Sequence, residues 1–244
     1  MFNKKSGILL VSGALALLPL TANAQSPEFT KEMDAFLGSD AGIEKMMKAF
    51  ERYSQKKQAQ QQKEEGASAS ENYKKFFSIG NSPVKGNKNA KVTIVEIADF
   101  RCGYCSRGND TIKEVLKAYP KDVKVVFKNQ PIMAKPAAIA GIAAHQQGKF
   151  WEMADLMFQN QRELSDEKIL ELAESLKLNM KKFKADLENP KIIKQVEDDS
   201  EMATKLGVTG TPGFFINGIP VRGAQPLEVF KSIIDDELAK GKKK

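Results

Sequence analysis

The stretch VTIVEIADFRCGYCSRGNDTIKEVLKAYPKDVKVVF, residues 92–127, has two β-rich segments flanking one with helical spacing. Residues 92–97 and 123–127 are apolar and β-branched, which favours buried strands. Apolar residues between them recur at intervals of three and four, which indicates an amphipathic helix: Ile112, Val115, Leu116 and Tyr119. Strand, helix and strand over so short a span predict a βαβ unit with parallel strands and a right-handed crossover.

The chain contains two cysteines, Cys102 and Cys105, at the junction of the first strand and the helix. A disulfide between them encloses only Gly103 and Tyr104, and such a short loop adds little stability because loop-closure entropy grows with loop length. The pair therefore indicates chemistry rather than a structural crosslink. Unpaired N–H groups at the helix start stabilise a thiolate, so Cys102 is the predicted nucleophile and Cys105 the predicted resolving thiol.

A Cys-x-x-Cys pair is also typical of half a zinc site, but zinc needs four ligands. The one histidine, His145, follows the alanine-rich run 137–144, so we interpret it as a packed or rim residue of a helix. The sequence therefore predicts no metal and no cofactor.

Two further features favour redox chemistry. Glu96 lies on an otherwise apolar strand six residues before Cys102. Partial burial there raises the pKa of a carboxyl group, which is then suited to exchange a proton with Cys105. Thr211 and Pro212 precede a strand, and a cis bond at that proline exposes the backbone of Thr211 for pairing with an extended client strand.

The first 24 residues have the composition of a secretory signal peptide. Lys4 and Lys5 precede an apolar run, and Ala22-Asn23-Ala24 is a small-residue cleavage site. The run is shorter than the roughly 20 residues that span a bilayer. We therefore expect cleavage after Ala24 and a periplasmic protein. The full chain has a formal charge of +7, part of which lies in a lysine-rich C-terminal tail. The other lysines are spread among acidic residues, so nucleic-acid binding is not expected.

Residues 25–72 are expected to form an N-terminal helical stalk and linker. Apolar residues from Ile43 to Tyr53 recur at helical spacing, a glutamine- and lysine-rich segment follows, and residues 66–70 resemble a flexible linker. The apolar stripe either docks on the protein's own main domain or packs against copies of itself. We favour the second interpretation, a homo-oligomer (dimer or trimer) formed through residues 28–65.

The remaining chain is predicted to form one α/β domain that is interrupted by helices. Residues 131–206 have helical patterns throughout, with helix-start signals at Ser165 and at Asn189-Pro190. Strand patterns return at 213–217 and 219–221, joined at Asn217-Gly218, before a last helix. The expected domains are therefore 73–130 with 207–244, and the helical insert 131–206.

From about Val92 to Leu238 the sequence resembles the DsbA-like branch of the thioredoxin superfamily. The resemblance is carried by Glu96 and Phe100 ahead of CGYC (102–105), by QGKFW (147–151) and by GVTGTP (207–212). It implies a thioredoxin fold with an inserted helical domain. It also implies that Pro212 is cis and faces the active disulfide, and that Glu96 is the buried proton acceptor.

One departure from DsbA-type oxidases is informative. They usually carry Pro-His between the cysteines, whereas Gly103-Tyr104 and Thr211 resemble DsbC-type isomerases. Tyrosine lacks the charge with which histidine stabilises the thiolate, so the two redox forms should be closer in stability. The stalk resembles, in plan alone, that of suppressor-of-copper-sensitivity C-type proteins. We therefore expect a disulfide isomerase or reductase, with Gly103, Tyr104, Thr211 and Pro212 contacting the client.

Two alternatives stay open. One is a DsbA-like oxidase, and the other is a periplasmic chaperone or scaffold in which binding is the function. The expected partners are exported client proteins with disulfides and a membrane redox partner, either a DsbD-like reductant or a DsbB-like oxidant.

Overall fold

The computed structural model divides the chain into two units, Met1–Gln62 and Lys63–Lys244. It describes residues 31, 35, 36, 38, 39, 42–49, 66 and 68–240. The expected signal peptide lies outside the described residues, as do Phe50 and Tyr53 of the apolar stripe. Among the helices of the described residues, none combines the length and the apolarity needed to span a bilayer.

The described part of the first unit contains a helix over residues 42–49. Ile43 and Met47 lie four residues apart and are exposed by 41% and 57%, while Met46 is half-buried. Residues at this spacing share one face of a helix. This helix therefore carries an exposed apolar face on its described residues.

The second unit is built on a five-stranded sheet with the order β1-β3-β2-β4-β5. The strands are β1 (Val84–Gly86), β2 (Val92–Ala98), β3 (Val123–Asn129), β4 (Gly213–Ile216) and β5 (Ile219–Arg222). β2 and β3 are parallel, in the register Val92↔Val123 to Ala98↔Asn129, and the helix α3 (Gly103–Ala118) joins them. The predicted βαβ unit is therefore confirmed, and the other neighbouring strands pair antiparallel.

The edge strand β1 is not predicted by the sequence, in which Asn81-Ser82-Pro83 and Gly86-Asn87 are typical of turns. Its three residues are all exposed, so they have no buried face and no apolar alternation. The strand forms because its residues pair with the strongly predicted β3, with Val84 opposite Val126. Tertiary pairing thus decides a conformation that local sequence does not.

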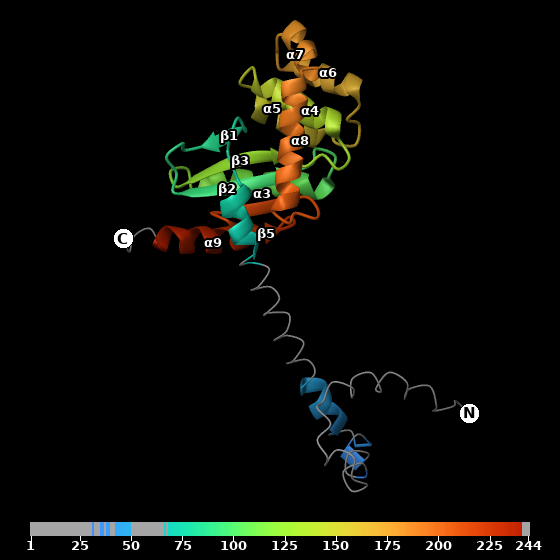
Figure 1. Cartoon of the computed structure of the whole chain (residues 1–244), viewed down its shortest axis with the longest axis vertical. Coiled ribbons are helices and arrows are strands. Elements are labelled where there is room, and N and C mark those ends of the chain that lie inside the picture. Colours follow the sequence, from blue (N-terminus) through green and yellow to red (C-terminus); the bar gives the residue numbers. More distant parts are fainter. Residues whose placement is uncertain are drawn as a thin grey trace, which may run out of the picture. The chain divides into compact units, whose positions relative to one another are not determined.

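Helices cover both faces of the sheet (Figure 1). On one face, α3 and α9 (Leu227–Lys240) pack over strand residues that include Val92 and Ile94. The opposite face of β2 presents Val95 and Ile97, as expected from strand alternation. This second face packs against the end of α8 (Pro190–Lys205) and against a short helix over residues 68–76.

Residues 68–70 were expected to belong to a flexible linker, and here the structure differs. They are helical, and the helix continues to residue 76. Its Tyr73 ring stacks on Phe77 and on Phe215 of β4, with ring centroids 4.6 and 5.5 Å apart. Burial of these rings outweighs the weak signal from the small residues that precede them.

Five helices lie between β3 and β4: α4 (Lys135–His145), α5 (Phe150–Gln159), α6 (Asp166–Ser175), α7 (Met180–Leu187) and α8. The side chains of Ser165 and Asn189 accept hydrogen bonds from backbone N–H groups at the starts of α6 and α8. Both predicted helix starts are thereby confirmed. α8 extends from the group α4–α7 to the sheet (Figure 1).

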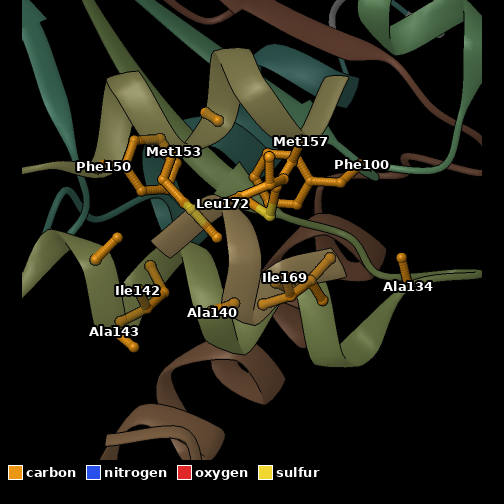
Figure 2. Close-up of a cluster of buried hydrophobic side chains, with 14 of the residues drawn as sticks. Phe100, Ala134, Ala140, Ile142, Ala143, Phe150, Met153, Met157, Ile169 and Leu172 are labelled. Atoms are coloured by element: carbon orange, nitrogen blue, oxygen red, sulfur yellow. The ribbon is translucent and has the colours of Figure 1, made fainter. Parts of the chain in front are cut away.

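The helical insert shares its core with the end of β2. Figure 2 shows Phe150, Met153 and Met157 of α5 beside Phe100, with Ile142 of α4 and Ile169 of α6 close to them. The same cluster includes both cysteines. Packing of the insert therefore supports the segment that carries the dithiol, in a thioredoxin fold with an inserted helical domain.

Candidate active site

The two cysteines lie where β2 passes into α3. β2 ends at Ala98, a short turn follows, and Cys102 is the N-cap residue of α3, with φ −83° and ψ 115°. The Cys102 N–H donates to the carbonyl oxygen of Asp99 at 3.1 Å, which fixes the turn. An N-cap position faces the unpaired N–H groups and the positive end of the helix dipole, both of which stabilise a thiolate.

The two thiols differ in exposure. Cys102 is 8% exposed, whereas Cys105 is fully buried one turn into α3. The Cys105 Sγ accepts a hydrogen bond from the Asp99 N–H at 3.5 Å, but burial raises the pKa of this thiol well above its ordinary value. Cys102 is therefore the more accessible of the two thiols, and its raised pKa keeps Cys105 protonated.

The segment Thr211–Pro212 faces Cys102. The Cys102 Sγ donates to the carbonyl oxygen of Thr211 at 3.4 Å, and the Thr211–Pro212 peptide bond is cis. This approach follows from the sheet, because β4 begins at Gly213 and pairs antiparallel with β2, with Gly213 opposite Ile97. Thr211 is half-buried and Pro212 is buried, so Thr211 remains partly open beside the reactive thiol.

Glu96 is fully buried in β2, more deeply than its predicted partial burial. By strand alternation it faces the same side of the sheet as Ile94 and Ala98, which is the side covered by α3. Neither of its carboxylate oxygens has a hydrogen-bond partner in the described part of the chain. Burial raises the pKa of Glu96 from 4.5 to about 8, so the carboxyl group holds its proton at neutral pH.

Two charged residues, Lys113 of α3 and Asp155 of α5, act electrostatically on Glu96. Lys113 Nζ lies 2.8 Å from Asp155 Oδ1, and the Asn109 side-chain amide donates to the same oxygen at 3.2 Å. The Lys113 charge lowers the pKa of Glu96 and the Asp155 charge raises it, both less strongly than burial does. Sequence reasoning missed these residues, although Cys105, Asn109 and Lys113 follow each other at four-residue spacing, which places them on one helix face.

Gly103 and Tyr104 form the exposed surface between the cysteines. The Tyr104 side chain is 61% exposed, and the Arg107 guanidinium lies over its ring, 4.3 Å from the centroid. Space beside Gly103 is open, because a Cβ atom there meets no heavy atom within 4 Å. The surface between the cysteines therefore consists of an exposed aromatic ring and an open position beside it.

Gly108 is a second residue that sequence reasoning missed. A Cβ atom at this position would lie 2.9 Å from Phe214 Cζ and 3.3 Å from Pro212 Cγ. The glycine thus lets α3 pass closely over the start of β4. A lone glycine inside a helical pattern is the sequence signal for such a close approach.

Other residues noted in the sequence lie away from the thiols. His145, at the end of α4, packs edge-on against Phe150 with centroids 6.2 Å apart, and burial lowers its pKa. Trp151 is half-buried and contacts both Phe127 and Phe150 edge-on. The structural interpretation of His145 agrees with these contacts.

Comparison with known proteins identifies the family. The model of the thioredoxin family matches residues 78–236. A probable disulfide bond formation protein D from Bacillus cereus is 34% identical over 181 residues, which cover 68% of this chain and 82% of the relative. The Na(+)/H(+) antiporter NhaA 3 from Salinispora tropica is 35% identical over 161 residues, 64% of this chain, which thus spans about a quarter (24%) of that relative.

The fold has counterparts among solved structures. A thioredoxin-like oxidoreductase from Silicibacter pomeroyi is 28% identical, with a TM-score of 0.59, over 68% of this chain and 94% of the other. The region that matches the thioredoxin family model contains the sheet, the insert and the dithiol described above. The chain therefore belongs to the thioredoxin family, in its DsbA-like branch.

Proposed function

We propose that this protein is an exported thiol-disulfide oxidoreductase that acts on the disulfides of client proteins, as an isomerase or reductase. The observation that carries the proposal is the asymmetry of the dithiol. Cys102 lies at a helix N-terminus against the Thr211 carbonyl, whereas Cys105 is fully buried. A reactive outer thiol beside a protonated inner thiol is the arrangement that thiol-disulfide exchange requires.

The reaction begins when the Cys102 thiolate attacks one sulfur of a client disulfide. A bond forms between Cys102 and the client, and the second client sulfur leaves as a thiolate. In isomerisation, another client thiolate attacks the client sulfur that is bonded to Cys102, so that a new client disulfide forms and Cys102 leaves as a thiolate. In reduction, Cys105 attacks the Cys102 sulfur, so that the dithiol loses two electrons and the client gains them.

The proton of Cys105 must leave before that thiol can attack. Glu96 lies on the sheet face beneath α3, and its pKa of about 8 lets it gain or lose a proton close to neutral pH. Glu96 in its ionised form accepts the Cys105 proton, and in its protonated form it returns the proton when the Cys102–Cys105 bond is reduced. The Lys113–Asp155 pair tunes the pKa of Glu96 from α3 and α5.

The residues between the cysteines support isomerase or reductase activity. Neither Gly103 nor Tyr104 carries a charge that stabilises the Cys102 thiolate, so the disulfide form is not strongly oxidising. A rival function, disulfide formation, is favoured by the name of the Bacillus cereus relative, a probable disulfide bond formation protein. The two functions differ in the redox state that the membrane partner maintains, reduced by a DsbD-like donor or oxidised by a DsbB-like acceptor.

Export and oligomerisation are parts of the same proposal. The signal-like residues 1–24 support a periplasmic location. Exposed Ile43 and Met47 on one helix face support a homo-oligomer through residues 28–65, which holds several dithiols around one client. Sedimentation of the mature chain tests this part: Ile43→Asp with Met47→Asp is expected to lower the molecular mass, and Lys45→Asp on the same helix is not.

Recovery of activity from a scrambled, multiply disulfide-bonded client tests the function. The reduced mature protein is expected to restore the client, and Cys102→Ser is expected to abolish the effect. Rapid oxidation of a reduced client without repair of the scrambled one supports the oxidase instead. Full rescue by Cys102→Ser contradicts both and favours a chaperone or scaffold in which binding is the function.

A further inference from the structure

Asp99 is a buried carboxylate immediately before the dithiol, and the reaction described above does not use its side chain. It is 1% exposed and follows the last residue of β2. Its backbone already holds both cysteines, since the Asp99 N–H donates to Cys105 Sγ and its carbonyl oxygen accepts from the Cys102 N–H. A buried charge is costly unless it is hydrogen-bonded, so this carboxylate needs partners inside the protein.

The Asp99 carboxylate joins two different segments. Its Oδ1 accepts from the Arg101 N–H at 2.7 Å, within the turn before Cys102. Its Oδ2 accepts from the Met133 N–H at 2.6 Å, in the segment that leads from β3 into the helical insert. Hydrogen bonds to an ionised acceptor are about twice as strong as neutral ones. One side chain therefore fastens the dithiol turn to the segment after β3.

The backbone N–H groups of the segment after β3 make few other hydrogen bonds to the sheet. The Gln130 N–H donates to the Ala98 carbonyl oxygen and so extends the β2–β3 ladder. Pro131 has no N–H, and the Ile132 N–H donates back to Gln130 within its own turn. α4 begins only at Lys135. The bond from Met133 to Asp99 therefore ties this segment directly to the dithiol turn, next to Ala134, which is buried in the core cluster that contains both cysteines.

This segment presents apolar side chains at the surface. Ile132, Met133 and Tyr104 are 59%, 56% and 61% exposed, the highest values among large apolar residues in the described part of the second unit. β2 and β3 are parallel, so the segments that follow them lie at the same edge of the sheet. A cavity of about 380 Å³, lined in part by Arg101, Met133 and Ala134, continues this edge toward α6.

We propose that Asp99 is a positioning residue whose carboxylate holds Ile132 and Met133, here called the apolar rim, beside Cys102. The rim selects clients with apolar residues next to their disulfide. This inference rests on the proposed function and adds to it a substrate preference and the residue that maintains it. Client selectivity, rather than the reactivity of the thiols alone, is the property that the Asp99 side chain controls.

The test uses the reduced mature protein and two peptides that contain the same disulfide, one flanked by leucines and the other by serines. The measured quantity is the ratio of kcat/KM for the apolar peptide to that for the polar peptide. We expect a ratio of at least about fivefold in the unaltered protein, lowered toward one by Asp99→Asn. Asparagine keeps the size of the side chain but provides one carbonyl oxygen for two N–H donors.

Two further variants separate positioning from a general loss of structure. The double variant Ile132→Ser with Met133→Ser changes only exposed side chains and is expected by itself to lower the ratio. Adding Asp99→Asn to this double variant should lower the ratio no further. Glu114→Gln removes one exposed negative charge from α3 and should keep the original ratio. Thermal unfolding of each variant checks the fold.

Three results overturn the inference. The first is a ratio near one in the unaltered protein, the second is an unchanged ratio in Asp99→Asn, and the third is an equal loss of kcat/KM for both peptides in that variant. A failure of the proposed function has a different signature. In that case the unaltered protein reduces neither peptide nor glutathione disulfide.

Discussion

Replacement of Glu96 by glutamine should change how stability depends on pH. Burial raises the pKa of Glu96 from 4.5 to about 8. Between these values the folded protein binds a proton that the unfolded chain has released, so the free energy of unfolding falls as the pH rises. At about 1.4 kcal/mol per pH unit, the decline due to this group reaches about 5 kcal/mol across the whole interval. The glutamine side chain of the variant cannot titrate, and its contribution stays constant.

Urea unfolding of the reduced protein at about pH 5, 6.5 and 8 measures this effect. We expect the stability of Glu96→Gln, relative to the unaltered protein, to increase by about 2 to 4 kcal/mol from the lowest pH to the highest. Other titrating groups cancel in the comparison, and any constant cost of burying the amide leaves the pH dependence unchanged. If the free energies of unfolding of the two proteins depend on pH in the same way, the conclusion that Glu96 is buried and protonated is refuted.

Three further substitutions have defined expectations. Tyr104→His introduces a cationic group that stabilises the Cys102 thiolate, so equilibration with glutathione should show a disulfide at least about tenfold more oxidising. An unchanged equilibrium constant with glutathione would contradict the proposed effect of the uncharged Gly103-Tyr104 pair. Gly108→Ala places a Cβ 2.9 Å from Phe214 Cζ, and denaturant unfolding should show a loss of about 1–3 kcal/mol, whereas a gain contradicts the close approach. Ser165→Ala removes the cap of α6 and should cost about 1 kcal/mol by the same measurement, while no loss means that the cap bond is not stabilising.

The helices and the inner strands of the second unit were largely predictable because local pattern and tertiary environment agree. β2 and β3 are apolar runs that become buried strands, and Ser165 and Asn189 start helices as their capping chemistry predicts. The hairpin between β4 and β5 turns at Asn217-Gly218, which both adopt positive φ angles of 48° and 90°, as the residue types at the turn suggest.

The elements that escaped prediction depend on contacts that are distant in sequence. β1 has no buried face, and residues 68–76 form a helix on the sheet because Tyr73 packs on Phe215. In the candidate site too, some features follow from local sequence and others depend on contacts that are distant in sequence. The roles of Cys102 and Cys105 follow from their spacing, whereas an aspartate after a strand is an ordinary turn residue until the structure brings Asp99 to Met133.

Trapping of the mixed disulfide tests the central claim, that Cys102 attacks client disulfides and Cys105 resolves them. The Cys105→Ser variant is incubated with a disulfide-bonded client, and the products are separated without reductant and identified by mass spectrometry. We expect a covalent complex through Cys102 that dithiothreitol releases, with little accumulation in the unaltered protein and none in Cys102→Ser. The absence of a complex in Cys105→Ser, despite a folded protein, would contradict the role of Cys102 as the attacking thiol.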